Sequence, residues 1–283
     1  MLVIFDNENI CVKFFPGSGK KDEIKITFNS HLPKARLAII DTNPLKGGWE
    51  AELTKANMPS LFVIEKNNSW FNFPEIHDVL ERINGITREF KKRIVIGASL
   101  GGHASLKFSS SLNPDLTISI SPQYCVNTDI VPFENRWRED IAAINEIQGS
   151  NIADENIKGL TYVIVDNNHI IDNSHVKLIK EKAPSTNIIQ LPDSGHSSAR
   201  ALFDLGLLEK ILLGDFDSIP NVIEKLEDDY NKSKLLSPTV IKIIAEKLDT
   251  QDRAKWIREK LPQLEGHPRH LEQLNDYLSK LEQ

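Results

Sequence analysis

The sequence has few cysteines and lacks a long hydrophobic run. Cys11 and Cys125 are the only two cysteines among 283 residues, and neither belongs to a CxxC pair. Two cysteines are too few for a disulfide framework, which favours a reducing compartment. No run approaches the ~18 apolar residues of a membrane-spanning helix. The first residues also lack the basic segment of a signal peptide. We therefore expect a cytoplasmic protein without a transmembrane segment.

The sequence also has no excess of basic residues. The chain has 34 Lys and Arg against 40 Asp and Glu, which gives a formal net charge of −6. Such a surface offers no overall positive field to a phosphate backbone, so nucleic acid is not an expected partner. The segment Gly17-Ser-Gly-Lys20 lacks the GxxxxGK[ST] spacing of a phosphate-binding loop, and we interpret it as a turn.

Short β-branched segments alternate with helical ones over the first two thirds of the chain. This alternation predicts an α/β fold with a doubly wound, mostly parallel sheet. A hairpin is expected over residues 2–15, and helices over residues 74–83, after Ser99 and over residues 174–182. The predicted strands are Ile24–Phe28, Arg36–Asp41, Ser60–Glu65, Arg93–Ile96, Leu116–Ile120, Leu160–Val165 and Asn187–Leu191.

Two segments depart from this pattern. Residues 126–159 are longer than a usual connection between strands, so they are a possible lid insertion. After residue 214 no strand pattern remains, and helical periodicity covers residues 221–230, 238–248, 251–260 and 267–281. We expect an α/β domain over residues 1–214 and a helical C-terminal subdomain over residues 215–283. The subdomain would pack on its own chain, form a homodimer or bind a protein partner.

The strongest chemical signal is Gly97-Ala-Ser99-Leu-Gly101, which follows a predicted buried strand and precedes a predicted helix. In that context G-x-S-x-G indicates a nucleophile elbow, where small neighbours let a strand and a helix approach a serine on a sharp turn. The helix N-terminus then directs N–H groups toward a developing oxyanion. Ser99 is the predicted nucleophile.

A serine nucleophile needs a base, and the loop Pro192-Asp-Ser-Gly-His196 supplies one in His196. A carboxylate should orient the imidazole, and Asp166 directly follows the predicted strand 160–165. Asp172 is the alternative acid, six residues further on, and Asp193 or no acid at all are the remaining options. The order Ser99, Asp166, His196 fits a triad whose members follow strand ends on one edge of a sheet.

Other residues are candidates for the oxyanion hole and the substrate cleft. The Leu100 N–H is the expected first oxyanion donor. The second donor would come from the loop of residues 28–31, which holds Ser30 and His31, or from residues 42–49. Trp49, Trp70 and His103 would line the cleft or pack in the core. His267 and His270 lack companions for a metal site, so no metal is expected.

With these motifs in order, the sequence over roughly residues 20–214 resembles the α/β-hydrolase superfamily. The residues Gly-Gly-His-Ala after Ser99 and Ser121-Pro-Gln-Tyr also resemble a bacterial branch, some members of which are linked to acyl groups on cell-surface glycans. The resemblance implies Ser99 as nucleophile, His196 as base and acid, Asp166 or Asp172 as the orienting carboxylate, and no cofactor.

Three functions are compatible with these residues. The first is a serine hydrolase that cleaves a small-molecule or glycan ester or thioester through an acyl-enzyme. The second is an acyltransferase, for example for O-acetyl groups on a glycan, in which an alcohol replaces water. The third is a binding module that works through the helical tail.

Overall fold

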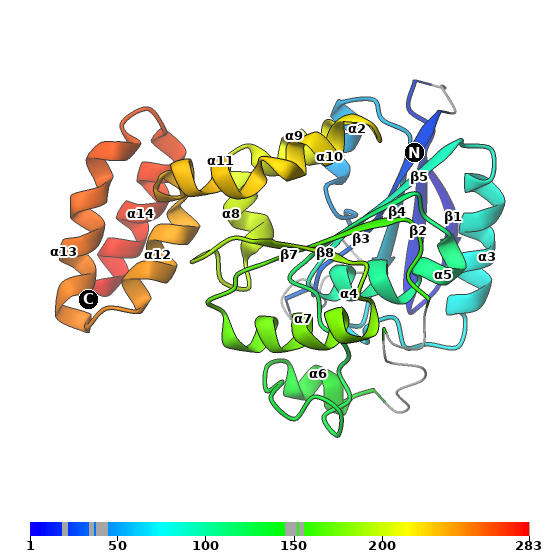
Figure 1. Ribbon diagram of the computed structural model, residues 1–283, viewed down its shortest axis with the longest axis horizontal. Helices are drawn as coiled ribbons and strands as arrows, with labels where there is room; N and C mark the ends of the chain where they lie inside the picture. The colour runs from blue at the N-terminus through cyan, green and yellow to red at the C-terminus, as the bar shows by residue number, and fades with distance from the viewer. Residues whose placement is uncertain (19–21, 34–36, 38–44, 145–151, 153–155, 283) are drawn as a thin grey trace. The chain divides into compact units, whose positions relative to one another are not determined.

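The computed structural model describes the chain except for residues 19–21, 34–36, 38–44, 145–151, 153–155 and 283 (Figure 1). Within the described residues, eight strands form one sheet in the order β1-β2-β4-β3-β5-β6-β7-β8. The strands are β1 Leu2–Asp6, β2 Ile10–Phe15, β3 Glu23–Phe28, β4 Ser60–Glu65, β5 Lys92–Ala98, β6 Leu116–Ile120, β7 Leu160–Val165 and β8 Asn187–Gln190.

The sheet is parallel through its centre. β1 and β2 form an antiparallel hairpin, and β2 also runs antiparallel to β4. The pairs β3–β4, β3–β5, β5–β6 and β6–β7 are all parallel. The carboxyl ends of these central strands therefore share one edge of the sheet, where α/β proteins place their functional loops.

Helices connect the strands and continue after the last one. The first helices are α2 Glu50–Lys55, α3 Ile76–Thr87, α4 Leu100–Lys107, α5 Ser109–Leu112, α6 Arg138–Ala142 and α7 Ile170–Lys182. They are followed by α8 Ser198–Asp204, α9 Leu207–Leu213, α10 Ser218–Glu224, α11 Leu226–Ser233, α12 Pro238–Glu246, α13 Thr250–Lys260 and α14 Pro268–Leu281. None of the helices in the described part of the chain is both long and apolar enough to cross a bilayer.

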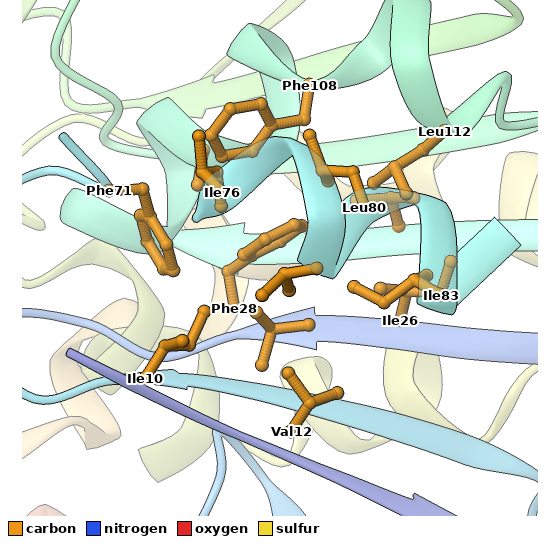
Figure 2. Packing of buried hydrophobic residues seen from close by; sticks show 14 of the residues in the cluster. Ile10, Val12, Ile26, Phe28, Phe71, Ile76, Leu80, Ile83, Phe108 and Leu112 are labelled. Carbon is orange, nitrogen blue, oxygen red and sulfur yellow. The ribbon is translucent and has the colours of Figure 1, made fainter. Parts of the chain in front are cut away.

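One face of the sheet carries the main hydrophobic core (Figure 2). Alternate residues of the strands point to this face, among them Ile26 and Phe28 of β3, and they pack against apolar residues of α3, α4 and α5. Phe28 is 1% exposed and meets Phe71 edge-on, with 5.3 Å between ring centroids. Burial of these side chains supplies the apolar contact that holds the helices to the sheet.

The opposite face is also covered. Residues of the other parity, such as Phe62 of β4, point there, and a Cβ at Gly47 would lie 2.4 Å from Cβ of Phe62. α2 follows Gly47, contacts β4 and buries Leu53 completely. A sheet that is covered on both faces explains why β4 and β6 are buried along their whole length.

The chain divides into two compact units. The first comprises residues 1–164 and 171–188, and the second comprises residues 165–170 and 189–283. Within the second unit, α12, α13 and α14 lie side by side (Figure 1) and share a small core around Ile241, Ile257 and Leu274. The Ser237 side chain accepts the N–H of Val240 and caps α12, with Pro238 in its first turn.

The predicted α/β fold with helices at its C-terminus is confirmed. The predicted strands 60–65, 116–120 and 160–165 match β4, β6 and β7 residue for residue. The strand expected over 36–41 lies outside the described residues apart from Leu37, which donates its backbone N–H to Pro33. The proposed division at residue 214 and the lid over residues 126–159 stay predictions.

Helix boundaries differ most from the sequence-based expectation. The helix predicted over 221–230 is two helices, α10 and α11, which meet at Lys225. The buried positions Ile219, Ile223, Leu226 and Tyr230 keep helical spacing across this junction, so hydrophobic periodicity does not reveal it. The helix predicted from residue 174 begins at Ile170.

Phe28→Ala tests the core on the first face. Removing this buried ring should lower the free energy of unfolding by about 3–5 kcal/mol, because the neighbouring rings cannot fill the cavity. Urea unfolding followed by tryptophan fluorescence measures the change. Phe203→Ala is the matched control, since Phe203 is 42% exposed, and it should cost less than about 1 kcal/mol. Equal losses in both variants would contradict this assignment of the core.

Candidate active site

Ser99 occupies a strained turn between β5 and α4. Its backbone angles are φ 53° and ψ −118°, outside the regions that L-residues normally adopt. The Ser99 N–H donates to Ile120 O at 2.8 Å, and its carbonyl accepts the His103 N–H at 2.9 Å. These bonds to the neighbouring strand and to the following helix hold the turn. Strain that is maintained in this way is a property of functional sites.

Three glycines make the tight junction possible. A Cβ at Gly97 would lie 2.0 Å from the carbonyl oxygen of Gly101, and one at Gly101 would lie 2.4 Å from that of Phe28. A Cβ at Gly102 would lie 2.9 Å from Ile120 O. Because each close atom belongs to the backbone, only glycine lets α4 approach β3, β5 and β6 this closely. Leu100, the first residue of α4, has an N–H without an intrahelical acceptor, as an oxyanion donor requires.

A glutamine side chain reaches the nucleophile. Gln123 follows β6 and is fully buried. Its Nε2 lies 3.5 Å from Ser99 Oγ, and its Oε1 accepts the indole N–H of Trp70 at 3.0 Å. Trp70 is itself 0% exposed. The structure therefore connects Trp70 to the site through the Gln123 amide.

His103 contacts the backbone of Gln123. Its ring is fully buried, and Nδ1 lies 2.9 Å from the backbone oxygen of Gln123. A carbonyl oxygen only accepts, so Nδ1 carries the proton. Burial and the nearby Lys107 lower the pKa of His103 to about 3. His103 is thus neutral at physiological pH and fixes the backbone of Gln123.

The loop after β3 is tied to the serine turn. Ser30 Oγ donates to Ala98 O at 3.0 Å, one residue before Ser99. The next residue, His31, places Nε2 at 2.8 Å from Asp140 Oδ2 of α6. Their side chains are 21% and 17% exposed. Ser30 is therefore bonded to the residue that precedes the candidate nucleophile, and the adjacent His31 is paired with Asp140, to which no sequence motif points.

Aromatic rings pack around His31. Its ring centroid lies 6.1 Å from that of Trp70 and 5.9 Å from that of Trp137, and the two indoles are 5.7 Å apart. Trp137 precedes α6, so part of the predicted lid segment meets the loop after β3. The guanidinium of Arg136 lies 4.4 Å from the Trp137 ring centroid.

Trp49 precedes α2 and has a left-handed backbone conformation. In the same loop, a Cβ at Gly48 would lie 3.2 Å from Phe28 O, which brings this loop to the end of β3. The other part of this candidate loop, residues 42–44, lies outside the described residues.

Glu65 holds the loop that carries Trp70. Its backbone N–H donates to Asn29 Oδ1, and its carbonyl accepts the Asn29 amide, so the ends of β3 and β4 are joined. Its carboxylate accepts the backbone N–H and the hydroxyl of Ser69. Burial raises the pKa of Glu65 to about 7, although the bonds from Ser69 lower it. This carboxyl group takes up its proton close to neutral pH.

Asp166 and His196 belong to the second unit. Asp166 is 1% exposed, and its carboxylate accepts the backbone N–H groups of Asn168, Asp193 and Gly195 at 2.8, 3.1 and 2.7 Å. It therefore fixes the turn that presents His196. The ring centroids of His196 and His169 are 6.2 Å apart.

The other candidate acids have ionic partners. Asp193 pairs with Lys247 at 2.7 Å and with Lys234 at 2.9 Å. Burial alone would raise the pKa of Asp193, but these lysines lower it to about 2. Asp172, on α7, is 0% exposed and lies 2.8 Å from Nη1 of Arg136.

Arg136 is the centre of a buried ionic network. It contacts both carboxylate oxygens of Glu134, and Glu134 also accepts from His175 Nε2 at 3.0 Å. His175 Nδ1 accepts the N–H of Tyr124, so the Nε2 proton is assigned. Burial opposes ionisation of Glu134, but His175 and Arg136 lower its pKa to about 2. The network, of which Asp172 is a member, fastens residues 124–136 to α7.

Some site residues escaped the sequence analysis. Gln123 lies in the quoted Ser121-Pro-Gln-Tyr segment but was given no role, Asp140 belongs to no motif, and the spacing of the sequence does not pair Asp140 with His31. Glu65 ends a buried strand, and that position was the one available signal. Among the described residues, no group of three or more His, Cys, Asp or Glu side chains is arranged to hold a metal ion.

No protein-family model matches the sequence, and no curated protein matches it. Solved structures do match. The capsule O-acetyltransferase of Neisseria meningitidis serogroup A has a TM-score of 0.50 at 12% identity, over 80% of this chain and 93% of that chain. Est1E from Butyrivibrio proteoclasticus has a TM-score of 0.51 at 9% identity, over 79% and 99%.

A third match is a chain of the Glycosylation Associate Protein (Gap123) complex from Streptococcus agalactiae. Its TM-score is 0.50 at 12% identity, over 73% of this chain and 45% of that chain. The chain has an α/β-hydrolase-type fold. Likeness at these identities concerns the fold, so the chemistry of this α/β-hydrolase-type chain has to be argued from its own residues.

Gly97→Ala tests the close approach at the serine turn. The new Cβ would meet the backbone of Gly101, so we expect a loss of stability of about 3 kcal/mol, measured by thermal unfolding. Gly85→Ala is the control, since a Cβ there meets none of the described heavy atoms within 4 Å. In α3 this change should stabilise the protein by about 0.5–1 kcal/mol. A neutral Gly97→Ala would contradict the described packing.

Glu65→Gln tests the buried carboxyl group. The folded protein keeps the Glu65 proton up to about pH 7, whereas the unfolded chain loses it near the ordinary value of 4.5. The folded state thus binds more protons between these values, and its stability falls as the pH rises through this window. The difference amounts to about 3 kcal/mol.

Urea titrations at pH 4.5 and 7.5 measure this effect. From pH 4.5 to pH 7.5, the free energy of unfolding of the wild type should fall by about 3 kcal/mol more than that of Glu65→Gln. Glu81→Gln, at an exposed helical position, should keep the pH dependence of the wild type. Parallel pH dependence in wild type and Glu65→Gln would refute the assignment.

Proposed function

We propose that this chain is a serine hydrolase that cleaves an ester or thioester through an acyl-enzyme on Ser99. The observation that carries the proposal is the backbone of Ser99, which is strained at the junction of β5 and α4 and is held there by glycine contacts. A serine in this position presents Oγ at the helix N-terminus, where N–H groups and the helix dipole stabilise negative charge.

In the proposed mechanism, His196 is the general base. It takes the Ser99 Oγ proton as Oγ bonds to the acyl carbon and the carbonyl electron pair moves to oxygen. When that pair returns, the bond to the leaving group breaks, and His196 donates the proton to the departing alcohol or thiol. Water repeats the sequence and releases the acid. The chain order of Ser99, Asp166 and His196 supports these roles.

Asp166 is the proposed orienting carboxylate. It directly follows β7, whose carboxyl end shares an edge of the sheet with that of β5. Its bonds to the N–H groups of Asp193 and Gly195 support a role through the turn that precedes His196. Asp172 and Asp193 are weaker candidates because their carboxylates already have cationic partners.

Acyl transfer to an alcohol is the second candidate function. The observation that favours it is the contact between His31 and Asp140 of α6, because the loop that holds His31 is bonded to the serine turn through Ser30. Such a pair offers a hydroxyl group both a donor and an acceptor. The Neisseria protein with this fold is an O-acetyltransferase by name. In both hydrolysis and transfer, the proposed substrate is an acyl group on a small molecule or a glycan.

We also propose a cytoplasmic location and an interaction surface, for a homodimer or a protein partner, on residues 215–283. Cys11 and Cys125 are buried and are not in disulfides, which fits a reducing compartment.

A fluorophosphonate probe tests the proposed nucleophile. Wild-type protein should be labelled at Ser99, located by mass spectrometry of the modified peptide. Ser99→Ala should lose the label, and His196→Ala should react at least about 10³-fold more slowly, because the base is missing. His169→Ala is the matched control and should stay within about 3-fold of wild type. A folded wild type that is not labelled would refute the proposal.

The two candidate acids are compared in the same assay. Asp166→Asn should slow labelling at least about 10²-fold, because His196 loses its support. Asp172→Asn should lower stability, because Arg136 loses one of its two carboxylate partners, and should leave labelling of the folded protein near the wild-type rate. The reverse pattern would identify Asp172, and not Asp166, as the orienting carboxylate.

Hydrolysis and transfer are separated by adding an acceptor. With 4-nitrophenyl acetate as donor, an acyltransferase should release nitrophenol faster when methyl glucoside is added and should form the acetylated glycoside. His31→Gln should abolish this acceleration and preserve hydrolysis. A rate that is independent of the glycoside, with no acetylated product, would exclude transfer to this acceptor class.

A further inference from the structure

We propose that the side-chain amide of Gln123 is the second oxyanion donor of the Ser99 site. The inference rests on the proposed function, because it assigns a catalytic role beside Ser99. It differs from the two loops that the sequence offered for this donor, since Gln123 follows β6 and acts through its side chain.

The orientation of the amide is determined by its neighbours. The indole N–H of Trp70 only donates, so the Gln123 atom at 3.0 Å from it must be the oxygen. The nitrogen of the same amide then faces Ser99 Oγ at 3.5 Å. The N–H groups of Gln123 are thereby directed at the reacting atom rather than at Trp70.

The donor is held before any substrate binds. Gln123 is 0% exposed, and His103 Nδ1 donates to its backbone oxygen at 2.9 Å. Trp70 is 0% exposed as well, and its loop is fixed by Glu65 through Ser69. A dipole fixed in a site that excludes water stabilises developing charge without a cost of reorganisation.

The long contact with Oγ matches this role. At 3.5 Å the amide makes a weak bond to the hydroxyl of the free protein. When Oγ bonds to the acyl carbon, the carbonyl electron pair moves to an oxygen that is attached to the same carbon, close to the amide. The Leu100 N–H and the Gln123 N–H then both donate to this oxygen. When the acyl-enzyme forms, the oxygen becomes a neutral carbonyl oxygen again, and both hydrogen bonds weaken.

Ser30 is a poorer donor for this oxygen. Its hydroxyl donates to Ala98 O at 3.0 Å, so its proton is already used to tie the loop to the serine turn. Gln123 has two N–H groups, and its second contact, with Ser121 O at 3.5 Å, still leaves one for the oxyanion.

Gln123→Glu is the sharpest variant, because it keeps an acceptor for Trp70 and the size of the side chain but replaces the N–H groups with oxygen. The second-order rate of fluorophosphonate labelling at pH 8 should fall about 10²–10³-fold. With an ester substrate, kcat should fall by a similar factor while KM stays within about 3-fold. Gln123→Ala should show a comparable loss.

Trp70→Phe tests the orientation of the amide. Without the indole N–H, the amide is free to turn, so labelling should slow by about 10-fold. Gln123→Ala combined with Trp70→Phe should react no more slowly than Gln123→Ala alone, since both changes remove one donor. Gln251→Ala, at an exposed position of α13, is the control and should match wild type.

The outcomes separate the two proposals. A folded wild type that is not labelled at Ser99 overturns the proposed function and this inference together. A labelled wild type with Gln123→Glu and Gln123→Ala within 3-fold of its rate overturns this inference alone. A raised KM with unchanged kcat also overturns it, because the amide would then bind substrate without stabilising the transition state. Circular dichroism confirms that the compared variants are folded.

Discussion

The close approach of α4 to the sheet is the constraint on which the described site depends. Without side chains at Gly97, Gly101 and Gly102, the backbone of α4 lies against the carbonyl groups of β3 and β6, and its Gly101 carbonyl lies against β5. This contact forces Ser99 into its strained turn and points the first N–H groups of α4 away from the helix. The energy that maintains the strain comes from the apolar core that binds α4 to the sheet.

A second layer of polar contacts surrounds the turn. Glu65 fixes Ser69, the same loop places the indole of Trp70, and the indole orients Gln123. His103 Nδ1 donates to the backbone oxygen of the same glutamine. The groups of this layer are buried, and Glu65, Trp70, Gln123 and His103 each make at least one hydrogen bond to a neighbour. Glu65 Oε2 and His103 Nε2 have no hydrogen-bond partner among the described residues, and buried polar atoms of this kind cost stability.

Local signals in the sequence predicted the sheet and the serine turn. Buried strands are runs of β-branched residues, and the G-x-S-x-G motif encodes its own geometry, because glycine spacing decides which backbones can touch. The contacts of Gln123 and Asp140 could not be predicted, since their partners Ser99 and His31 lie 24 and 109 positions away in the sequence. The junction of α10 and α11 was missed because burial continues across it with unchanged periodicity.

The ionic network around Arg136 also constrains how this fold can change. It joins Glu134 of one connecting segment to Asp172 and His175 of α7, with the Arg136 guanidinium paired to both carboxylates. A loop exchange that replaced residues 124–137 alone would strand two charged or polar groups of α7 in the interior. Recombination or directed evolution must therefore exchange residues 124–137 and α7 together.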